Sequence, residues 1–259
     1  MKHFLVVLLS LLSAICVAQT SLKFPDGKKS LIVLTYDDAL NSHLDIAIPQ
    51  LDKANLKGTF FLNVPAEKQI SRWREAAKKG HELGNHTVFH PCESSKFPAD
   101  PHYHAEKYTV GNIVREIAAM NKILCAIDGK LMHSYAYPCG ETEVGGKSYI
   151  DSLRKTGFVR YARGIGFNPI ITDLKGIDPL NVPCMGFSTN GPASEILNFV
   201  KQVQEKKGMG VLIFHGIGGD YLQATAEAHQ ELVNYLQNHK DIWVATFEEA
   251  MNYMTESGK

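Results

Sequence analysis

Short apolar runs alternate with helical stretches along almost the whole chain. From Ser30 onwards the strand-like runs are SLIVLTYDD, KGTFFLN, HELGNHT, HSYAYP, FVRYARG, MGVLIFH and DIWVAT. Between them lie helical stretches such as SRWREAAKKG, VGNIVREIAAMNKILCAI and ASEILNFVKQVQEKKG. This alternation predicts an α/β fold with a parallel sheet covered by helices. About seven strands fit a distorted, nearly closed (β/α) barrel; an open doubly wound sheet is the alternative, although no GxGxxG follows the first strand.

The first residues have the layout of an export signal. A positive start, an apolar run and small residues near Ala18 predict a secretory signal peptide over residues 1–18 and a single mature domain over 19–259. The apolar run is too short to cross a bilayer as a helix. Lipid attachment at Cys16 is disfavoured because the bulky Ile15 precedes it. We therefore expect a secreted or periplasmic protein with no transmembrane span.

The charge balance argues against a nucleic-acid partner. Lysine and arginine together number 27, as do aspartate and glutamate, so the formal net charge is +0. No basic stripe is visible, so nucleic-acid binding has little support. No protein partner is evident from the sequence either.

Four cysteines remain once the signal peptide is removed. They allow three complete pairings, and the sequence alone does not choose among them. They show no CxxC spacing, which disfavours a zinc–cysteine cluster, and buried free thiols fit as well as disulfides. The four are Cys92, Cys125, Cys139 and Cys184.

Titratable side chains stand where the predicted strands end. TYDD supplies Asp37 and Asp38, NHTVFH supplies His86 and His90, and LIFHG supplies His215. In a β/α barrel the working residues lie at the carboxyl ends of the strands. Two histidines and one carboxylate form the three-ligand set of a catalytic metal site, which keeps one position open. Histidines four residues apart share a face if their segment makes a helical turn.

Adjacent acids on a strand point to opposite faces, so one of Asp37 and Asp38 can bind the metal while the other acts as a base. A water molecule activated by the metal would be the nucleophile, and the free carboxylate would accept its proton. His215 would protonate the leaving group. These parts describe hydrolysis of an acyl bond, with one divalent metal as cofactor. Zinc suits the ligand set, and cobalt and nickel also accept it.

With these motifs the chain resembles NodB-type polysaccharide deacetylases of carbohydrate esterase family four, from about Lys29 to about Met254. The matching elements are TYDD, HTVFH preceded by GHELGN, YAYPCG and LIFHG. The resemblance implies a secreted, metal-dependent hydrolase that removes acetyl groups from an oligo- or polysaccharide. N-acetyl amide bonds are the favoured substrate, and acetyl esters of xylan-type polymers are the alternative.

The resemblance also implies a role for each matching residue. Asp37 would be the general base and His215 the general acid, and the backbone N–H of Cys139 would stabilise the oxyanion. The implied metal ligands are Asp38, His86 and His90.

The chain departs from the family pattern in two places. Ala136 stands where the family often has an arginine that holds the base; Arg160 and Arg163 are possible substitutes, and Arg163 is preferred. The acid that orients the catalytic histidine has no firm position. Its candidates are Asp173 and Asp178.

Two tyrosines close to the motifs are candidates for contact with a sugar. Tyr36 and Tyr137 are predicted to line a sugar groove, with the core as the alternative position.

Two other functions fit the sequence. The missing arginine at Ala136 raises a function of another class, a carbohydrate-binding protein with little turnover. A metal-dependent amidase for non-sugar acyl amides is a third possibility. Acetate release from acetylated oligosaccharides and from small acetamides would separate the three.

Overall fold

A computed structural model describes residues 22–96, 100–166, 168–175 and 177–257; the predicted signal peptide lies outside these ranges. Its centre is a mostly parallel sheet with the strand order β7-β4-β3-β2-β1-β9-β8, and β10 pairs with the first half of β1. The parallel strands are β1 Ser30–Asp37, β2 Thr59–Leu62, β3 Glu82–Asn85, β4 Tyr135–Ala136, β7 Ala162–Arg163, β9 Met209–Phe214 and β10 Ile242–Ala245. Each corresponds to one of the predicted apolar runs.

Helices follow the strands, as the alternation predicted. A single π-helical turn, η2 (His43–Ala47), leads into α1, and Pro49 stands in the first turn of α1, where a missing N–H costs least. The helices are α1 Ile48–Lys53, α2 Ile70–Lys78, α3 Val110–Asp128, α4 Ile150–Thr156, α5 Ala193–Glu205, α6 Ala226–Asn238 and α7 Phe247–Ser257.

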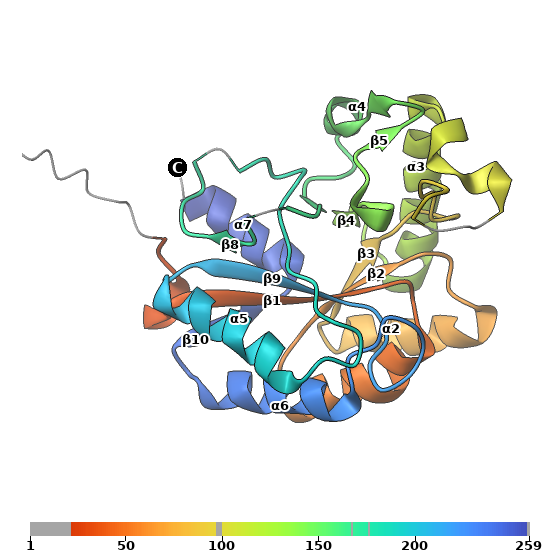
Figure 1. Ribbon diagram of the computed structural model, residues 1–259. Coiled ribbons are helices and arrows are strands. Elements are labelled where there is room, and N and C mark those ends of the chain that lie inside the picture. The colour runs from red at the N-terminus through yellow and green to blue at the C-terminus, as the bar shows by residue number, and fades with distance from the viewer. Residues whose placement is uncertain (1–21, 97–99, 167, 176, 258–259) are drawn as a thin grey trace, which may run out of the picture.

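The central strand β1 is buried on both faces, which explains its unbroken apolar run. Ile32 and Leu34 pack toward a core shared with the helices α1, α2, α5 and α6. Leu31 and Val33 point the other way, into a second core that is filled by α7. Figure 1 shows α5 and α6 along one side of β1 and β9, and α7 along the other. Odd-numbered residues of β1 therefore face the inside of the curled sheet.

The sheet curls into a half-barrel whose remaining gap is spanned by irregular chain. Val182 exchanges backbone hydrogen bonds of 2.9 Å with β7, through Ala162 and Gly164. Met185 does the same with β9, through Val211 and Ile213, at 2.8 and 2.9 Å. The segment 182–185 thus bridges the two strands through isolated contacts only. The predicted distorted barrel of about seven parallel strands is confirmed in this curled form.

Three short elements were not predicted. The strand β8 (Ile170–Ile171) pairs antiparallel with β9, and β5 (Glu143–Val144) forms a hairpin with β6 (Lys147–Ser148). Each is two residues long, too short to carry a period-two pattern. Within the described ranges, no helix combines the length and apolar character needed to cross a bilayer.

Candidate metal and catalytic site

The carboxyl end of β1 sends its two acids in different directions. Asp37 is an odd-numbered residue and points into the half-barrel, where it is 2 % exposed. Asp38 leaves the strand in the left-handed region, with φ 81°, and Ala39 follows with φ 54°. The Asp38 N–H still donates to the Phe61 carbonyl at 3.0 Å, which fixes the turn to β2. The backbone break therefore lets both carboxylates border one site.

The histidine segment after β3 is a tight turn and not the helical turn that was one expectation. Thr87 and His90 adopt positive φ values of 64° and 52°. The Asn85 side chain accepts the Thr87 N–H at 2.9 Å, and the Thr87 hydroxyl accepts the His90 N–H at 3.0 Å. These local bonds bring the His86 and His90 rings to a centroid distance of 4.7 Å.

A buried acid from α3 holds the tip of the same turn. Glu116 accepts the backbone N–H groups of Val88 and Phe89 through one oxygen, at 3.1 and 2.7 Å. Charge-assisted bonds of this kind are the stronger ones. The turn that carries both histidines is thus fixed by α3.

The three residues expected to bind a metal meet in one cluster. One ligand atom from each of Asp38, His86 and His90 lies within 4.8 Å of the others. Oδ1 of Asp38 is 3.5 Å from Nε2 of His86 and 3.4 Å from Nε2 of His90. Burial, followed by the charge of His86, lowers the pKa of His90, which favours the neutral imidazole that a metal requires. This donor set fits a divalent metal such as zinc.

His86 is oriented by the backbone of β4. Its Nδ1 lies 2.9 Å from the Ala136 carbonyl oxygen, which can only accept, so Nδ1 carries the proton. Nε2 then presents its lone pair toward Asp38. Such a hydrogen bond behind a metal-ligating histidine fixes both its tautomer and its direction.

Asp37 is paired with Arg163 inside the half-barrel. Nη2 of Arg163 donates to Oδ2 of Asp37 at 2.5 Å, and both residues are 2 % exposed. Oδ1 of Asp37 has no hydrogen-bond partner among the described residues. Burial alone would raise the pKa of Asp37, but Arg163, with His86 and His215, holds it below its ordinary value. Arg163 therefore occupies the place predicted for the missing arginine, whereas Arg160 lies exposed beside Tyr161.

His215 borders the same cluster at the end of β9. Its Nε2 is 3.8 Å from Oδ2 of Asp38, and its side chain is 26 % exposed. Its backbone carbonyl accepts from Nε2 of the buried His43 at 2.7 Å. Burial lowers the pKa of His43 to about 4, so this donor is a neutral imidazole at physiological pH.

Neither acid suggested for orienting His215 lies against it. Asp178 binds Arg154 at 2.7 Å and the Leu180 N–H at 2.9 Å. Asp173 accepts the N–H of Lys175 on the surface. The His215 backbone is instead anchored by His43, a residue that the motifs did not single out.

The two tyrosines expected in a sugar groove lie in the core. Tyr36 is fully buried, and its hydroxyl pairs with Nε2 of His229 at 2.7 Å. Tyr137 is 1 % exposed, and its hydroxyl donates to the Leu180 carbonyl at 2.7 Å. Neither ring can reach a sugar in this conformation, which corrects that expectation.

Tyr221 belongs to the site, although the sequence motifs did not indicate it. Its hydroxyl donates to Oδ2 of Asp38 at 2.8 Å, and its ring lies 6.1 Å from that of His215. It stands in the glycine-rich loop after β9, and half of the residue is exposed. A glycine-rich loop directly after a strand that ends in histidine was the one available signal.

Replacing Tyr221 with phenylalanine should weaken zinc binding by roughly tenfold, because the Asp38 carboxylate loses the bond that fixes its second oxygen. Competition with a chromophoric chelator measures the dissociation constant of zinc. Tyr253→Phe, whose ring packs on Trp243, is the matched control and should bind zinc like the wild type. Equal affinities for all three proteins would show that Tyr221 does not support Asp38.

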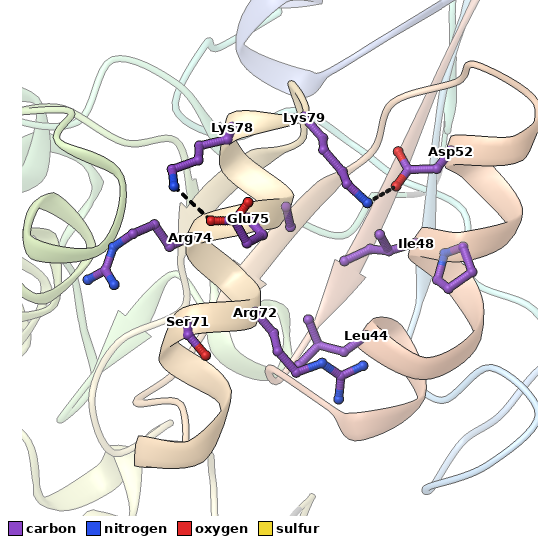
Figure 2. Close-up of a pocket in the computed structure, with 11 residues that line it drawn as sticks. Leu44, Ile48, Asp52, Ser71, Arg72, Arg74, Glu75, Lys78 and Lys79 are labelled. Carbon is purple, nitrogen blue, oxygen red and sulfur yellow. Dashed lines mark hydrogen bonds and ion pairs between the residues drawn. The ribbon is translucent and has the colours of Figure 1, made fainter.

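Two hollows differ in their relation to this site. A cavity of about 140 Å³ adjoins His215 and is walled in part by Phe187, Ile213 and Leu222. A groove of about 620 Å³ lies between α1 and α2, on the outer helical layer (Figure 2). Its charges are largely paired, Lys79 with Asp52 and Lys78 with Glu75, as the dashed lines in Figure 2 mark. None of the strand-end acids and histidines lines that groove.

The curled parallel sheet, with acids and histidines at its carboxyl edge, places the protein in the class of β/α-barrel proteins whose working residues lie at that edge. Residues 25–160, more than half of the chain, match the family described as polysaccharide deacetylase. The chain therefore belongs to the polysaccharide deacetylase family.

The chain is also similar to other proteins in sequence or in fold. The chain is 24 % identical over 247 residues to a gellan lyase from a Bacillus species, a match that covers 88 % of this chain but 9 % of that protein. The chain thus spans less than a tenth of this curated relative. Two solved structures share the fold. The catalytic domain of peptidoglycan N-acetylglucosamine deacetylase from Eubacterium rectale has a TM-score of 0.57, with 16 % identity over 88 % of this chain and 91 % of that one. A family 4 acetyl xylan esterase from Clostridium thermocellum, in complex with a cobalt ion, has 0.56, with 17 % identity over 86 % and 90 %.

Proposed function

We propose that the protein is an exported, metal-dependent hydrolase that removes acetyl groups from a carbohydrate. The observation that carries this proposal is the meeting of Asp38, His86 and His90 beside the buried Asp37–Arg163 pair. Ligands for a metal and a carboxylate of lowered pKa thus adjoin at the open edge of the sheet. Membership of the polysaccharide deacetylase family supports the substrate class.

Asp38, His86 and His90 would hold the metal, with Oδ1 of Asp38 facing both imidazoles. A divalent metal supplies a Lewis acid that polarises the acyl carbonyl and lowers the pKa of a water molecule. We expect zinc to support activity, with cobalt and nickel as substitutes, because imidazole and carboxylate ligands accept all three.

The chain's own residues would carry the proton transfers. Asp37 would accept the proton of the attacking water through Oδ1, while Arg163 keeps Oδ2 and holds the carboxylate ionised. His215 would donate a proton to the departing nitrogen or oxygen. The Cys139 N–H would donate to the negative charge that develops on the carbonyl oxygen of the acyl group.

The cavity beside His215 favours a small acyl group. Its volume is about 140 Å³, and Phe187, Ile213 and Leu222 give it an apolar wall. An acetyl methyl group would fit such a space, whereas a long acyl chain would need the loops around it to move. We therefore infer acetyl as the group removed. We propose an N-acetyl amide as the bond that is cleaved, with an acetyl ester as the alternative.

Export is part of the same proposal. The residue pattern over 1–18 motivates it, and a disulfide between Cys92 and Cys139 supports it. Disulfides persist in oxidising compartments and are rare in the cytosol.

Acetate release tests the proposal. The metal-stripped protein is reloaded with zinc, cobalt or nickel and incubated with acetylated chito-oligosaccharides, acetylated xylan or small acetamides. We expect release from the chito-oligosaccharides, and a fall of roughly 100- to 10,000-fold in His215→Ala, the loss typical of a missing proton donor. His102→Ala, an exposed histidine paired with Asp100, should keep wild-type rates.

Other outcomes would assign the site differently. Release from xylan alone would make the protein an acetyl esterase, and release from acetamides alone would make it a non-sugar amidase. No release from any substrate, with zinc bound, would favour a carbohydrate-binding protein. The carbohydrate-binding alternative was suggested by the alanine at position 136, where an arginine was expected. Arg163 weakens this argument because it binds Asp37 in place of that arginine.

A further inference from the structure

A disulfide joins two loops that border the site. Cys92 and Cys139 are 47 residues apart in sequence and bonded through their sulfur atoms, with Cα atoms 5.8 Å apart. Cys92 is buried and stands two residues after His90; its sulfur lies 3.7 Å from Nδ1 of His90. Cys139 belongs to the loop that follows β4. The bond therefore ties the loop of one proposed metal ligand to the loop of the proposed oxyanion donor.

Within the described part of the chain, one backbone N–H group of the loop after β4 has no acceptor. Cys139 and Gly140 both have positive φ, 52° and 71°. The N–H groups of Gly140 and Glu141 bond back to the carbonyls of Tyr137 and Pro138, at 2.9 and 3.0 Å. The N–H of Cys139 has no such partner among the residues described. Successive N–H groups in a turn of this kind form a concavity that favours anions.

The same two loops have a second, weaker connection. The Glu141 carboxylate accepts the Glu93 N–H at 3.0 and 3.1 Å, and Lys96 lies 3.1 Å from it. The ion pair with the half-exposed Lys96 contributes little rigidity, whereas the bonds from Glu93 N–H to the buried Glu141 carboxylate are a genuine polar link between the loops. The disulfide adds a covalent link between the loops to this polar one and to the β3–β4 pairing.

We propose that the Cys92–Cys139 disulfide is a positioning element that holds the Cys139 N–H at a set distance from His90, and that full activity requires this bond to be oxidised. The inference rests on the proposed deacetylase function. A donor aimed at developing charge is effective only if it is held before the reaction begins. A displacement of about 1 Å in a catalytic group can lower a rate a hundredfold.

The Cys92→Ala/Cys139→Ala double variant tests the proposal, because alanine keeps the backbone N–H and removes only the bond. Cys125→Ala is the control, since Cys125 is a free cysteine on α3. For all three zinc-loaded proteins we would measure kcat, KM and the zinc Kd. For the cobalt-loaded proteins we would measure the Kd of acetate, the product anion, from the visible spectrum. Thiol titration before and after reduction counts the disulfide directly.

We expect kcat of the double variant to fall roughly tenfold to a hundredfold, with KM and the zinc Kd within about threefold of wild type. The acetate Kd should rise about tenfold, the worth of one hydrogen bond to a charged group. A purely stabilising disulfide would change the melting temperature and leave kcat and the acetate Kd alone. That result, or a wild-type protein that gains no thiols on reduction, would overturn the proposal.

Two further measurements cover a variant that does not fold and a wild type that releases no acetate. If the double variant does not fold, wild-type protein reduced with a water-soluble phosphine replaces it; the disulfide gains two electrons and two protons, and the phosphine becomes its oxide with oxygen from water. If the wild type releases no acetate from any substrate, the deacetylase function fails. The acetate Kd of oxidised and unbridged protein still tests the disulfide in that case.

Discussion

Asparagine in place of Asp37 should lower the rate of acetate release by roughly 100- to 10,000-fold, the contribution typical of a positioned general base. Asparagine has nearly the same shape, and its carbonyl oxygen can still accept from Arg163. It cannot accept the proton of an attacking water. Initial rates at saturating zinc measure the loss.

The neighbouring acid supplies the contrast. Asp38→Asn should weaken zinc binding by more than an order of magnitude, because Asp38 faces both imidazoles at 3.4 and 3.5 Å. Asp37→Asn should leave the zinc Kd within a few-fold of wild type. If Asp37→Asn keeps more than a tenth of the wild-type rate, the base lies elsewhere. If it loses zinc instead, the division of labour between the two acids is reversed.

Much of this site could be predicted because polar residues interrupt apolar strands at one edge of the sheet. Strand ends follow from the apolar runs, and parallel strands place their carboxyl ends together. This logic brought Asp38, His86, His90 and His215 to one place. It could not supply Tyr221, whose contact with Asp38 depends on the path of a loop.

The position of Tyr36 in the core, and not in a sugar groove, follows from the geometry of the strand. Consecutive residues of a strand point to opposite faces. Because Asp37 points into the half-barrel, Tyr36 must point toward the helical layer, where its hydroxyl meets His229. Tyr137 could not be placed in this way, because it lies just past the two-residue strand β4 and its partner Leu180 is distant in sequence.

The sequence could not predict which cysteines pair or how the gap in the sheet is spanned. Cys92 and Cys139 stand in loops, whose approach depends on the whole fold and not on any local pattern. The segment 182–185 spans the gap between β7 and β9 without forming a regular strand, so it leaves no periodic signal. Both features depend on tertiary structure that local propensity does not encode.

Methionine in place of Arg163 should reduce the free energy of unfolding by about 3–5 kcal/mol at pH 7, because it leaves the buried Asp37 charge without a partner. Arg163 also lies over the Phe61 ring, at 5.2 Å from its centroid, so methionine keeps part of the apolar contact. Urea unfolding measures the loss. Arg160→Met, which removes an exposed arginine three residues earlier, should stay within about 0.5 kcal/mol of wild type.

The pH dependence of this loss has a definite sign. In the wild type the pKa of Asp37 is lowered, so its contribution to stability is present above the ordinary aspartate pKa and is lost as pH falls toward the lowered value. Without Arg163, burial raises the pKa of Asp37, so its charge destabilises the variant as pH rises above the ordinary value. The destabilisation by Arg163→Met should therefore be large at pH 7 and small near pH 4.

The same substitution should change the pH dependence of activity. The acidic limb of the kcat/KM profile should move to higher pH, because the base is protonated over a wider range. Asp37→Asn/Arg163→Met, which removes both charges, should recover part of the stability and lose its dependence on pH in this range. A destabilisation that is the same at both pH values would mean that Arg163 acts through packing and not through the charge of Asp37.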